Sequence, residues 1–222
     1  MTMTGEENVT ALRELDSCAV SDALDTLGLP GAVTALAPMW PVPTVLAGRV
    51  RTVTAQPKAA AGPVTHIATP LVASTEPGDV VVIDNHGRTD VSCWGGLLAE
   101  AAIRRGVAGV LVDGACRDVQ DSQALALPLF ARAAVPVSAR GRIVQAAMDE
   151  RIQVDGVSVA AYDYVIADVN GVVFLAAGEA ERVIGLARRI AEREARMADA
   201  VRAGQDVREV MHDSRFPTVS AE

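Results

Sequence analysis

Three short apolar runs, separated by helix-length segments, constrain the fold of this chain most. They are DVVVID at 79–84, GVLVD at 109–113 and LPLFAR at 127–132. Their length and branched aliphatic content predict buried strands. The segment 92–105 predicts a helix between the first two strands, and Asp118 opens a shorter helix between the second and the third. This alternation predicts parallel pairing through right-handed crossovers, and therefore an α/β fold.

Segments on either side predict further elements around this core. An interrupted 3.6-residue period over 8–28 predicts helix, within which Ser21 could cap a second helix. Three other segments complete the prediction: a strand at 47–56, a short helix at 64–73, and a strand-rich stretch at 156–176 with a hairpin turn at Asn170-Gly171.

A long charged helix is predicted over roughly 178–203. At 1.5 Å per residue it would be ~39 Å long, which is longer than a compact domain of this size needs. Its apolar stripe consists of Val183, Ile190, Met197 and Val201. We therefore expect this helix to pack on a neighbouring subunit of a homo-oligomer.

Length and composition fit a single domain in a reducing compartment. We expect one domain over 1–222, with a core of about 12–177 and a helical C-terminal extension of about 178–215. Half of the residues are apolar, which is enough for a packed core. The three cysteines fit neither a disulfide framework nor a zinc site, and the first ten residues show no signal-peptide pattern. Since no apolar run reaches membrane-spanning length either, we expect a cytoplasmic protein without a membrane partner.

Basic residues are scattered, which bears on two functions. The formal net charge is −8 and no run of Lys or Arg is present, so nucleic acid is not an expected partner. Lys58 is the only lysine, and its position after Pro57 predicts a loop. A Schiff-base aldolase needs a positioned lysine amine, so the sequence favours a metal over an imine for aldolase chemistry.

Polar loops follow two neighbouring strands of the predicted sheet. The first loop is 84–87 and the second is 113–118, while the Gly95-Gly96 pair opens the helix between them. In parallel sheets, ligands bind at the carboxyl ends of the strands. We therefore expect one crevice that combines a helix N-terminus, which attracts anions, with Arg117 and Asp118. Arginine grips a carboxylate through two parallel hydrogen bonds, and aspartate can hold a divalent cation.

Plainer interpretations stay open for these residues and their neighbours. Arg117 and Asp118 could form a structural ion pair or a helix cap. His86 could be a base, a substrate contact or a surface residue. Cys116 fits small-residue packing better than nucleophilic catalysis, because no histidine lies near it in the sequence. Asp90 could cap the helix that follows it.

The segment WGGLLAEAAIRRGVAGVLVDGACRDVQDSQALALPLFAR, 94–132, resembles the signature region of the RraA-like family. That family includes 4-hydroxy-4-methyl-2-oxoglutarate/4-carboxy-4-hydroxy-2-oxoadipate aldolases, which also decarboxylate oxaloacetate, and regulators of ribonuclease E activity. The resemblance covers roughly 12–205, and three flanking motifs agree with it: CAVSDALDTLG at 18–28, GDVVVID at 78–84 and DVNGVVF at 168–174. It implies a swivelling β/α/β-type domain with a central mixed sheet flanked by helices and a long C-terminal helix.

The resemblance also implies roles for individual residues. Arg117 corresponds to the arginine that holds the carboxylate of pyruvate, and Asp118 to the direct ligand of Mg²⁺ or Mn²⁺. The backbone N–H groups of Leu97 and Leu98, which follow the Gly95-Gly96 pair, correspond to the cradle for that carboxylate.

A glutamate on the C-terminal helix of the adjacent subunit reaches the water shell of the metal in this family. Glu194 is its best match here and Glu192 the second, within a trimer or a dimer of trimers. The chain departs from the family at Gly96, where aldolases can carry an acidic residue that holds a metal-bound water. Glycine there implies a weaker outer shell, unless another carboxylate such as Asp90 replaces it.

The implied function is a divalent-metal-dependent aldolase or oxaloacetate decarboxylase. Such an enzyme cleaves a carbon–carbon bond of an α-keto acid and leaves pyruvate as its enolate. Two alternatives remain: a protein–protein regulator on the same fold without catalysis, and a lyase or hydratase that acts on a different keto acid.

Overall fold

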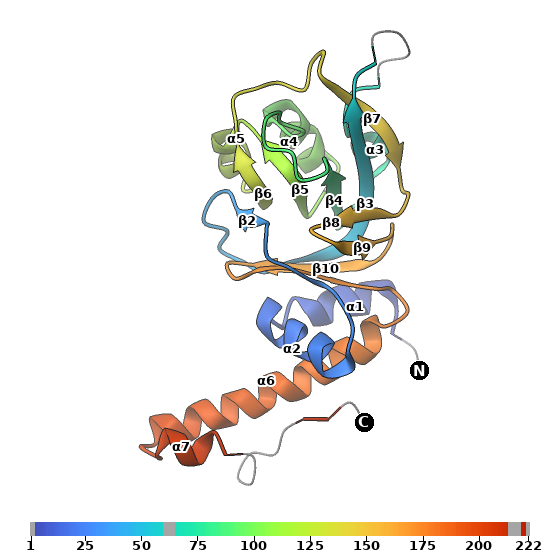
Figure 1. The fold of residues 1–222 in the computed structure, drawn as a ribbon. Helices are drawn as coiled ribbons and strands as arrows, with labels where there is room; N and C mark the ends of the chain where they lie inside the picture. Colours follow the sequence, from blue (N-terminus) through green and yellow to red (C-terminus); the bar gives the residue numbers. More distant parts are fainter. Residues whose placement is uncertain (1–2, 60–64, 213–218, 221–222) are drawn as a thin grey trace.

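The molecule has a sheet-containing body with a helical layer beneath it (Figure 1). The computed structural model describes residues 3–59, 65–212 and 219–220. The long C-terminal helix crosses the lower part of Figure 1 and extends beyond the body. Among the described residues, no helix is both long enough and apolar enough to cross a membrane.

The predicted parallel core is confirmed. Four strands run parallel, side by side: β3 (Leu46–Pro57), β4 (Asp79–Asp84), β5 (Gly109–Cys116) and β6 (Leu129–Ala134). The connecting helices are α4 (Gly96–Arg104), between β4 and β5, and α5 (Val119–Ala124), between β5 and β6. α4 begins later than predicted, because Ser92 forms a β-bridge to Ala115 and Cys93 donates its N–H to the Ala115 carbonyl.

Antiparallel strands extend this core, so the described residues form a mixed sheet of nine strands. Its order is β1-β11-β10-β3-β4-β5-β6-β2, and β7 also pairs with β3. The added strands are β1 (Ala32–Val33), β2 (Ala37–Pro38), β7 (Ile143–Met148), β10 (Tyr164–Asp168) and β11 (Gly171–Leu175). The turn between β10 and β11 lies at Val169-Asn170, one residue earlier than predicted, because Asp168 pairs with Gly171.

The N-terminal helices are α1 (Gly5–Leu12) and α2 (Ser17–Leu27). The prediction that Ser21 caps the second helix is wrong, because the Asp16 side chain is the cap and accepts the Ala19 N–H. Asp168, at the end of β10, accepts the N–H and the O–H of Ser17 at 2.8 and 2.7 Å. These two bonds fix the start of α2 on the sheet, which is why the helix begins there.

The predicted helix over 64–73 is shorter and begins later, as α3 (Thr69–Ser74). Pro70 lies in its first turn, the part of a helix that tolerates proline. Residue 64 lies outside the described residues.

Each face of the sheet buries its own apolar cluster. α3, α4 and α5 cover the face of the parallel core that carries Ile83 and Val112. The opposite face carries Val82 and Leu111 and packs against a separate hairpin of β8 (Ile152–Val154) and β9 (Val157–Val159). α1, α2 and α6 (Ala180–Arg202) pack on β10 and β11. The sheet is therefore covered where β4 and β5 run, and open at their carboxyl ends.

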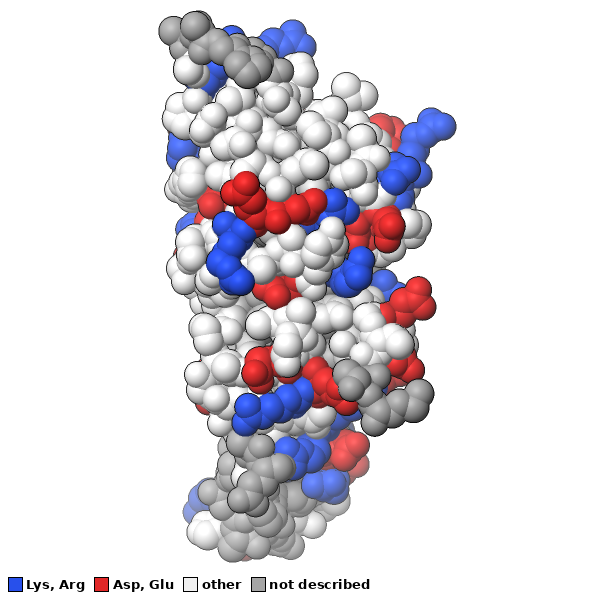
Figure 2. Space-filling view, turned by 90° about the vertical axis from the view of Figure 1, so that its right-hand side faces the viewer, with Lys and Arg blue, Asp and Glu red and all other residues white. Residues whose placement is uncertain are grey.

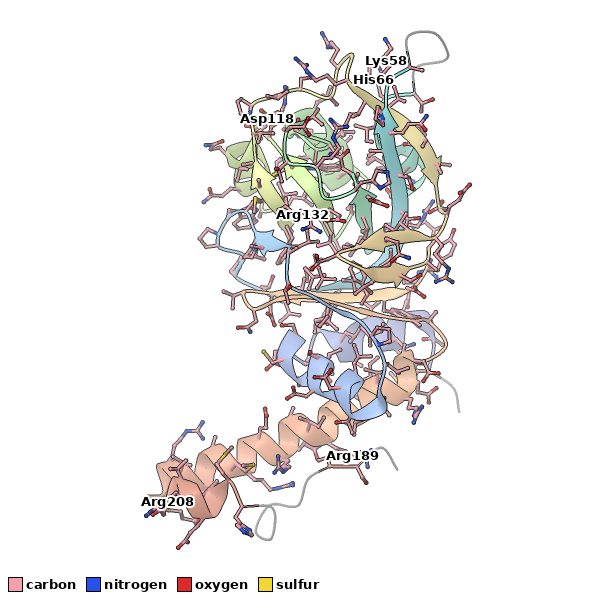
Figure 3. All side chains as sticks on the ribbon, viewed as in Figure 1. Lys58, His66, Asp118, Arg132, Arg189 and Arg208 are labelled. Atoms are coloured by element: carbon pink, nitrogen blue, oxygen red, sulfur yellow. The ribbon has the colours of Figure 1, made fainter. Side chains whose placement is uncertain are left out.

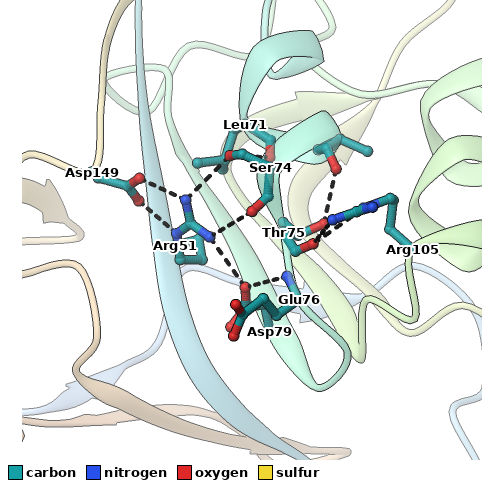
Figure 4. A network of polar contacts seen from close by, with 9 residues as sticks. Arg51, Leu71, Ser74, Thr75, Glu76, Asp79, Arg105 and Asp149 are labelled. Atoms are coloured by element: carbon teal, nitrogen blue, oxygen red, sulfur yellow. Dashed lines mark hydrogen bonds and ion pairs between the residues drawn. The ribbon is translucent and has the colours of Figure 1, made fainter.

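A buried arginine connects β3, β4 and α3 (Figure 4). Arg51 forms ion pairs with Asp149 at 2.7 Å and with Asp79 at 3.2 Å. It also donates to the carbonyl and the hydroxyl of Ser74. The hydrogen bonds that Arg51 donates to Asp149 raise the pKa of Arg51, so the guanidinium stays charged. Because this charge is matched on several sides, the network positions the junction of the three elements.

α6 confirms the predicted long C-terminal helix. It has 23 residues and is about 35 Å long. Val183 and Ile190 pack with α1 and α2, whereas Met197 packs against Val210 of α7 (Val207–Val210). Val201, predicted in the apolar stripe, is 43% exposed because no sheet lies beneath this part of the helix. The part of α6 after residue 190 thus leaves the body (Figure 1).

Candidate functional site

Arg117 and Asp118 lie where β5 ends and α5 begins. Asp118 has φ 54° and ψ 43°, a left-handed conformation that non-glycine residues rarely adopt and that recurs at functional sites. Its side chain does not cap α5. Instead, Asp118 Oδ2 accepts the Gly96 N–H and the Arg117 Nε–H, each at 3.1 Å. Three residues predicted for the site from two separate segments therefore lie together.

The Gly95-Gly96 pair makes this close approach possible. A Cβ at residue 95 would lie 2.9 Å from Asp118 Oδ2 and 3.3 Å from the Arg117 side chain. A Cβ at residue 96 would lie 2.1 Å from Asp121 Oδ2. Any larger residue at either position would push against a carboxylate, so the two glycines leave room for both acidic side chains.

The guanidinium of Arg117 has hydrogen-bond donors that are not used by the described residues. Its Nε–H is donated to Asp118, but neither of its Nη groups donates to another residue that the structure describes. The side chain is 39% exposed and lines a cavity of about 160 Å³ with Trp94, residues 95–98 and Asp118. Two parallel N–H donors at the end of a guanidinium match the two oxygens of a carboxylate. The cavity can therefore bind a small molecule that carries a carboxylate.

The start of α4 lines the same cavity and offers one open backbone donor. The Leu97 N–H has no acceptor within the described part of the chain. The Leu98 N–H, however, is donated to the Gly95 carbonyl at 3.1 Å, as in a tight first helical turn. The predicted cradle of Leu97 and Leu98 is thus half open, and Leu98 would have to exchange this bond for one to a ligand.

Oxygen donors suited to a divalent cation flank the glycine pair. They are the carboxylates of Asp118 and Asp121. Mg²⁺ usually binds through one or two carboxylates and keeps several waters. No group of three or more His, Cys, Asp or Glu side chains that could hold a metal occurs among the described residues. The donors of one chain therefore fit a largely hydrated Mg²⁺ or Mn²⁺ that has positions left for substrate and for a further donor.

Glu194 does not join this site within one chain. It lies on α6, at the opposite end of the molecule from Asp118 (Figure 3). Glu194 and Glu192 are both exposed. Only a second copy could bring α6 to the cavity, so the role of Glu194 stays a prediction.

The start of α4, Arg117 and Asp118 line one cavity, as predicted, whereas Asp84, His86 and Asp113 of the two polar loops line a second one. Alternation along the strands turns Asp84 and Asp113 to the face that carries Val82 and Leu111, away from α4. His86, beside Asp84, goes with them. These residues therefore do not belong to the Arg117–Asp118 site.

The second cavity, of about 420 Å³, contains a charged network that the sequence analysis missed. Arg132 on β6 forms ion pairs with Asp113 and with Asp155 of the β8–β9 turn. The bond to Asp113 raises the pKa of Arg132. Burial acts to raise the pKa of Asp155, but the N–H groups of Thr34 and Ala35, with Arg132, outweigh it and lower that pKa. Arg132 lies two residues after Phe130 on β6, and this spacing could have predicted that both side chains turn to the same face of the sheet.

Cys116 and Cys93 are buried thiols in the cluster beneath α4. Burial raises the pKa of Cys116 to about 11 and that of Cys93 to about 12. Both remain protonated at neutral pH, which favours packing over nucleophilic catalysis. Asp90 is paired with Arg88 at 2.9 Å and does not cap α4, whose N-cap is Gly95.

Charged side chains of both signs mix on the face shown in Figure 2, where acidic groups lie beside basic ones. Lys58 follows β3 in a loop, as predicted, and lies at the same end of the molecule as Asp118 in Figure 3. It lines neither cavity.

Comparison with known proteins bears on this arrangement directly. The family model for RraA-like proteins, described as Aldolase/RraA, matches residues 17–174. The chain belongs to the RraA-like family. The match includes the Gly95-Gly96 pair and Arg117-Asp118, so the resemblance drawn from the sequence is confirmed over the segment that forms the cavity.

Individual relatives agree with this membership. DlpA of Legionella pneumophila is 28% identical over 198 residues, which are 89% of this chain and 32% of DlpA. This chain thus spans about a third of that relative. A protein of Halalkalibacterium halodurans that provisionally bears the name 4-hydroxy-4-methyl-2-oxoglutarate aldolase is 31% identical over 181 residues, 82% of each chain. The crystal structure of an uncharacterized protein from Pseudomonas syringae, 27% identical, covers 96% of this chain and all of that chain with a TM-score of 0.85.

Proposed function

We propose that this RraA-like protein is a divalent-metal-dependent lyase that cleaves a carbon–carbon bond beside an α-keto acid, as an aldolase or a decarboxylase. The observation that carries the proposal is the convergence of Arg117, Asp118 and the start of α4 on one cavity. An α-keto acid presents a carboxylate, which suits Arg117 and the start of α4. It also presents a polarisable carbonyl, which suits a cation held by Asp118. The family description and the name of the Halalkalibacterium halodurans relative support the same chemistry.

Each residue would make a distinct contribution. Arg117 would donate its two Nη groups to the substrate carboxylate, with the Leu97 N–H as a third donor. Asp118 would hold the cation through Oδ1, because Oδ2 already accepts two hydrogen bonds. The chemistry that bound Mg²⁺ or Mn²⁺ supplies is Lewis-acid stabilisation of the enolate charge. Aldol cleavage and loss of CO₂ from oxaloacetate both end in pyruvate enolate, so one site would serve both reactions.

The test is pyruvate release from oxaloacetate and from 4-hydroxy-4-methyl-2-oxoglutarate, with Mg²⁺, with Mn²⁺ and after treatment with a chelator. We expect release that depends on the cation and is lost in Asp118→Ala. A screen of other α-keto acids covers a lyase or hydratase with a different substrate. If no keto acid reacts at any cation concentration, the alternative of a non-catalytic protein–protein regulator gains and the lyase proposal fails.

The site would be completed by Glu194 of the partner subunit, within a trimer or a dimer of trimers. Two observations support this: α6 leaves the body after residue 190, and the donors of one chain leave a position open at Asp118. Complementation tests it. Inactive Asp118→Ala and Glu194→Ala subunits, mixed after reversible dissociation, should regain activity at interfaces that join one intact half-site from each. Verified mixed oligomers without activity would show that the two residues do not act across an interface.

A further inference from the structure

The space beside Gly96 is filled by a carboxylate from another element. Asp121 belongs to the first turn of α5, three residues after Asp118. A Cβ built on Gly96 would lie 2.1 Å from Asp121 Oδ2, 3.0 Å from its Cγ and 3.2 Å from its Cβ. The whole acidic end of Asp121 therefore occupies the volume into which a side chain at residue 96 would extend.

Asp121 has no structural task that explains this position. Neither of its carboxylate oxygens accepts a hydrogen bond from any residue that the structure describes, so it does not cap α5 or α4. Asp118 and Asp121 nevertheless meet at Gly96: Asp118 Oδ2 accepts the Gly96 N–H, and the exposed Asp121 carboxylate occupies the space beside the Gly96 Cα. Asp118 accepts the Arg117 Nε–H and the Gly96 N–H, whereas Asp121 has no cationic partner among the described residues. A cation near two neighbouring carboxylates would reduce the repulsion between their negative charges.

We propose that Asp121 is a positioning residue for the divalent cation, and that it supplies from α5 the outer-shell carboxylate that residue 96 does not provide. The inference rests on the proposed metal-dependent function. Asp118 would hold the cation directly, and Asp121 would accept a hydrogen bond from one of the waters that the cation keeps. Gly96 is then required, because any side chain at residue 96 would displace the Asp121 carboxylate.

Binding of Mn²⁺ alone, followed by the electron paramagnetic resonance signal of the free ion, tests this without reference to turnover. Asp121→Asn keeps the size of the side chain and removes its charge, so the fold should be preserved, as a thermal melt would show. We expect it to weaken Mn²⁺ binding roughly 10-fold or more, the range typical of outer-shell partners. Asp90→Asn is the matched control, since it removes the same charge from an exposed carboxylate beside Arg88, and it should leave the affinity unchanged.

A reciprocal exchange makes the test independent of that single variant. Gly96→Asp alone should bring no gain in Mn²⁺ affinity, because the new side chain competes with Asp121 for the same volume. Gly96→Asp combined with Asp121→Ala should recover affinity that Asp121→Ala alone loses. Wild-type affinity in Asp121→Asn, or equal losses in the Asp121 and Asp90 variants, would overturn the role of Asp121 while leaving metal dependence intact. Absence of Mn²⁺ binding by the wild type would overturn both proposals.

Discussion

The two cavities at the carboxyl ends of β4, β5 and β6 hold similar residues but use their charges differently. In the larger cavity, Arg132 is bound by Asp113 and Asp155, and the second oxygen of Asp155 is held by backbone N–H groups. In the smaller cavity, Arg117 keeps both Nη groups and Asp118 keeps Oδ1 without a partner among the described residues. Ion pairs that match charge with charge stabilise a fold, whereas an arginine with both Nη groups unused beside a cavity marks a place for a ligand.

The largest effect should follow from Asp118→Ala. It removes the carboxylate that we propose holds the metal directly, and loss of Lewis-acid stabilisation should lower kcat/KM on the order of a thousandfold. The protein should still fold, with a modest fall in melting temperature, because the variant loses two hydrogen bonds and places alanine in a left-handed conformation. Activity of this variant close to that of the wild type, or wild-type activity that survives complete removal of divalent metal, would contradict the assignment.

Arg132→Met should have the opposite profile. It leaves Asp113 buried without its cationic partner, and an unpaired buried charge of this kind costs about 3 kcal/mol of unfolding free energy. Denaturant unfolding measures this loss, and the activity of the remaining folded protein should be unchanged. Arg208→Met, at an exposed pair far from both cavities, is the control and should change neither quantity. A large loss of activity per folded molecule would mean that the second cavity takes part in the reaction.

Arg117→Lys tests whether the Nη donors act as a fork. Lysine keeps the charge but not the planar pair of donors, and a lost charged hydrogen bond is worth about 1.5–3 kcal/mol. We expect KM for the keto acid to rise roughly 10-fold or more, with the fold intact. Arg88→Lys, at an exposed pair with Asp90, provides the comparison and should not change KM. Equal KM in the Arg117 variant and the wild type would remove the carboxylate fork from the proposal.

Acid should destabilise the folded protein through the ion pair between Asp155 and Arg132 in the larger cavity. Its pKa lies below the usual 3.8, so the charged form favours the folded state. Stability from this group is fully present above pH 3.8 and is lost as the pH falls through the lowered pKa of the folded protein. The wild type should thus be more stable than Asp155→Asn at pH 6, and the gap should narrow below about pH 4. A gap that stays constant down to pH 3 would show that the carboxylate charge is not what stabilises the turn.

The order of strands and helices was predictable because apolar period and segment length reflect local burial. The boundaries of the elements were less predictable where a hydrogen bond to a residue distant in the sequence fixes them. Ser92 and Cys93 are extended because they pair with Ala115, and α2 begins at Ser17 because Asp168 binds it. Neither partner is visible as a local pattern in the sequence.

The smaller cavity was largely predictable, since Gly95-Gly96 and Arg117-Asp118 follow strands that are neighbours in the sheet. Asp84 and His86 follow a neighbouring strand, but they line the other cavity, because Asp84 turns to the opposite face of the sheet. Asp121 was not predicted as a site residue from the sequence. Its significance depends on the contact with Gly96, which only the packing of α5 beside α4 creates.

The protruding part of α6 makes hydrogen exchange a direct reporter of assembly. Residues 191–202 form about three turns whose buried side chains, among those described, reach mainly α7. A helix this short without a surface to pack on is marginal in water. In a separated chain, its amides should exchange far faster than those of 180–190, which α1 and α2 cover. Contact of this segment with another copy would slow the exchange of its amides alone. The dependence of that protection on protein concentration would then give the association constant.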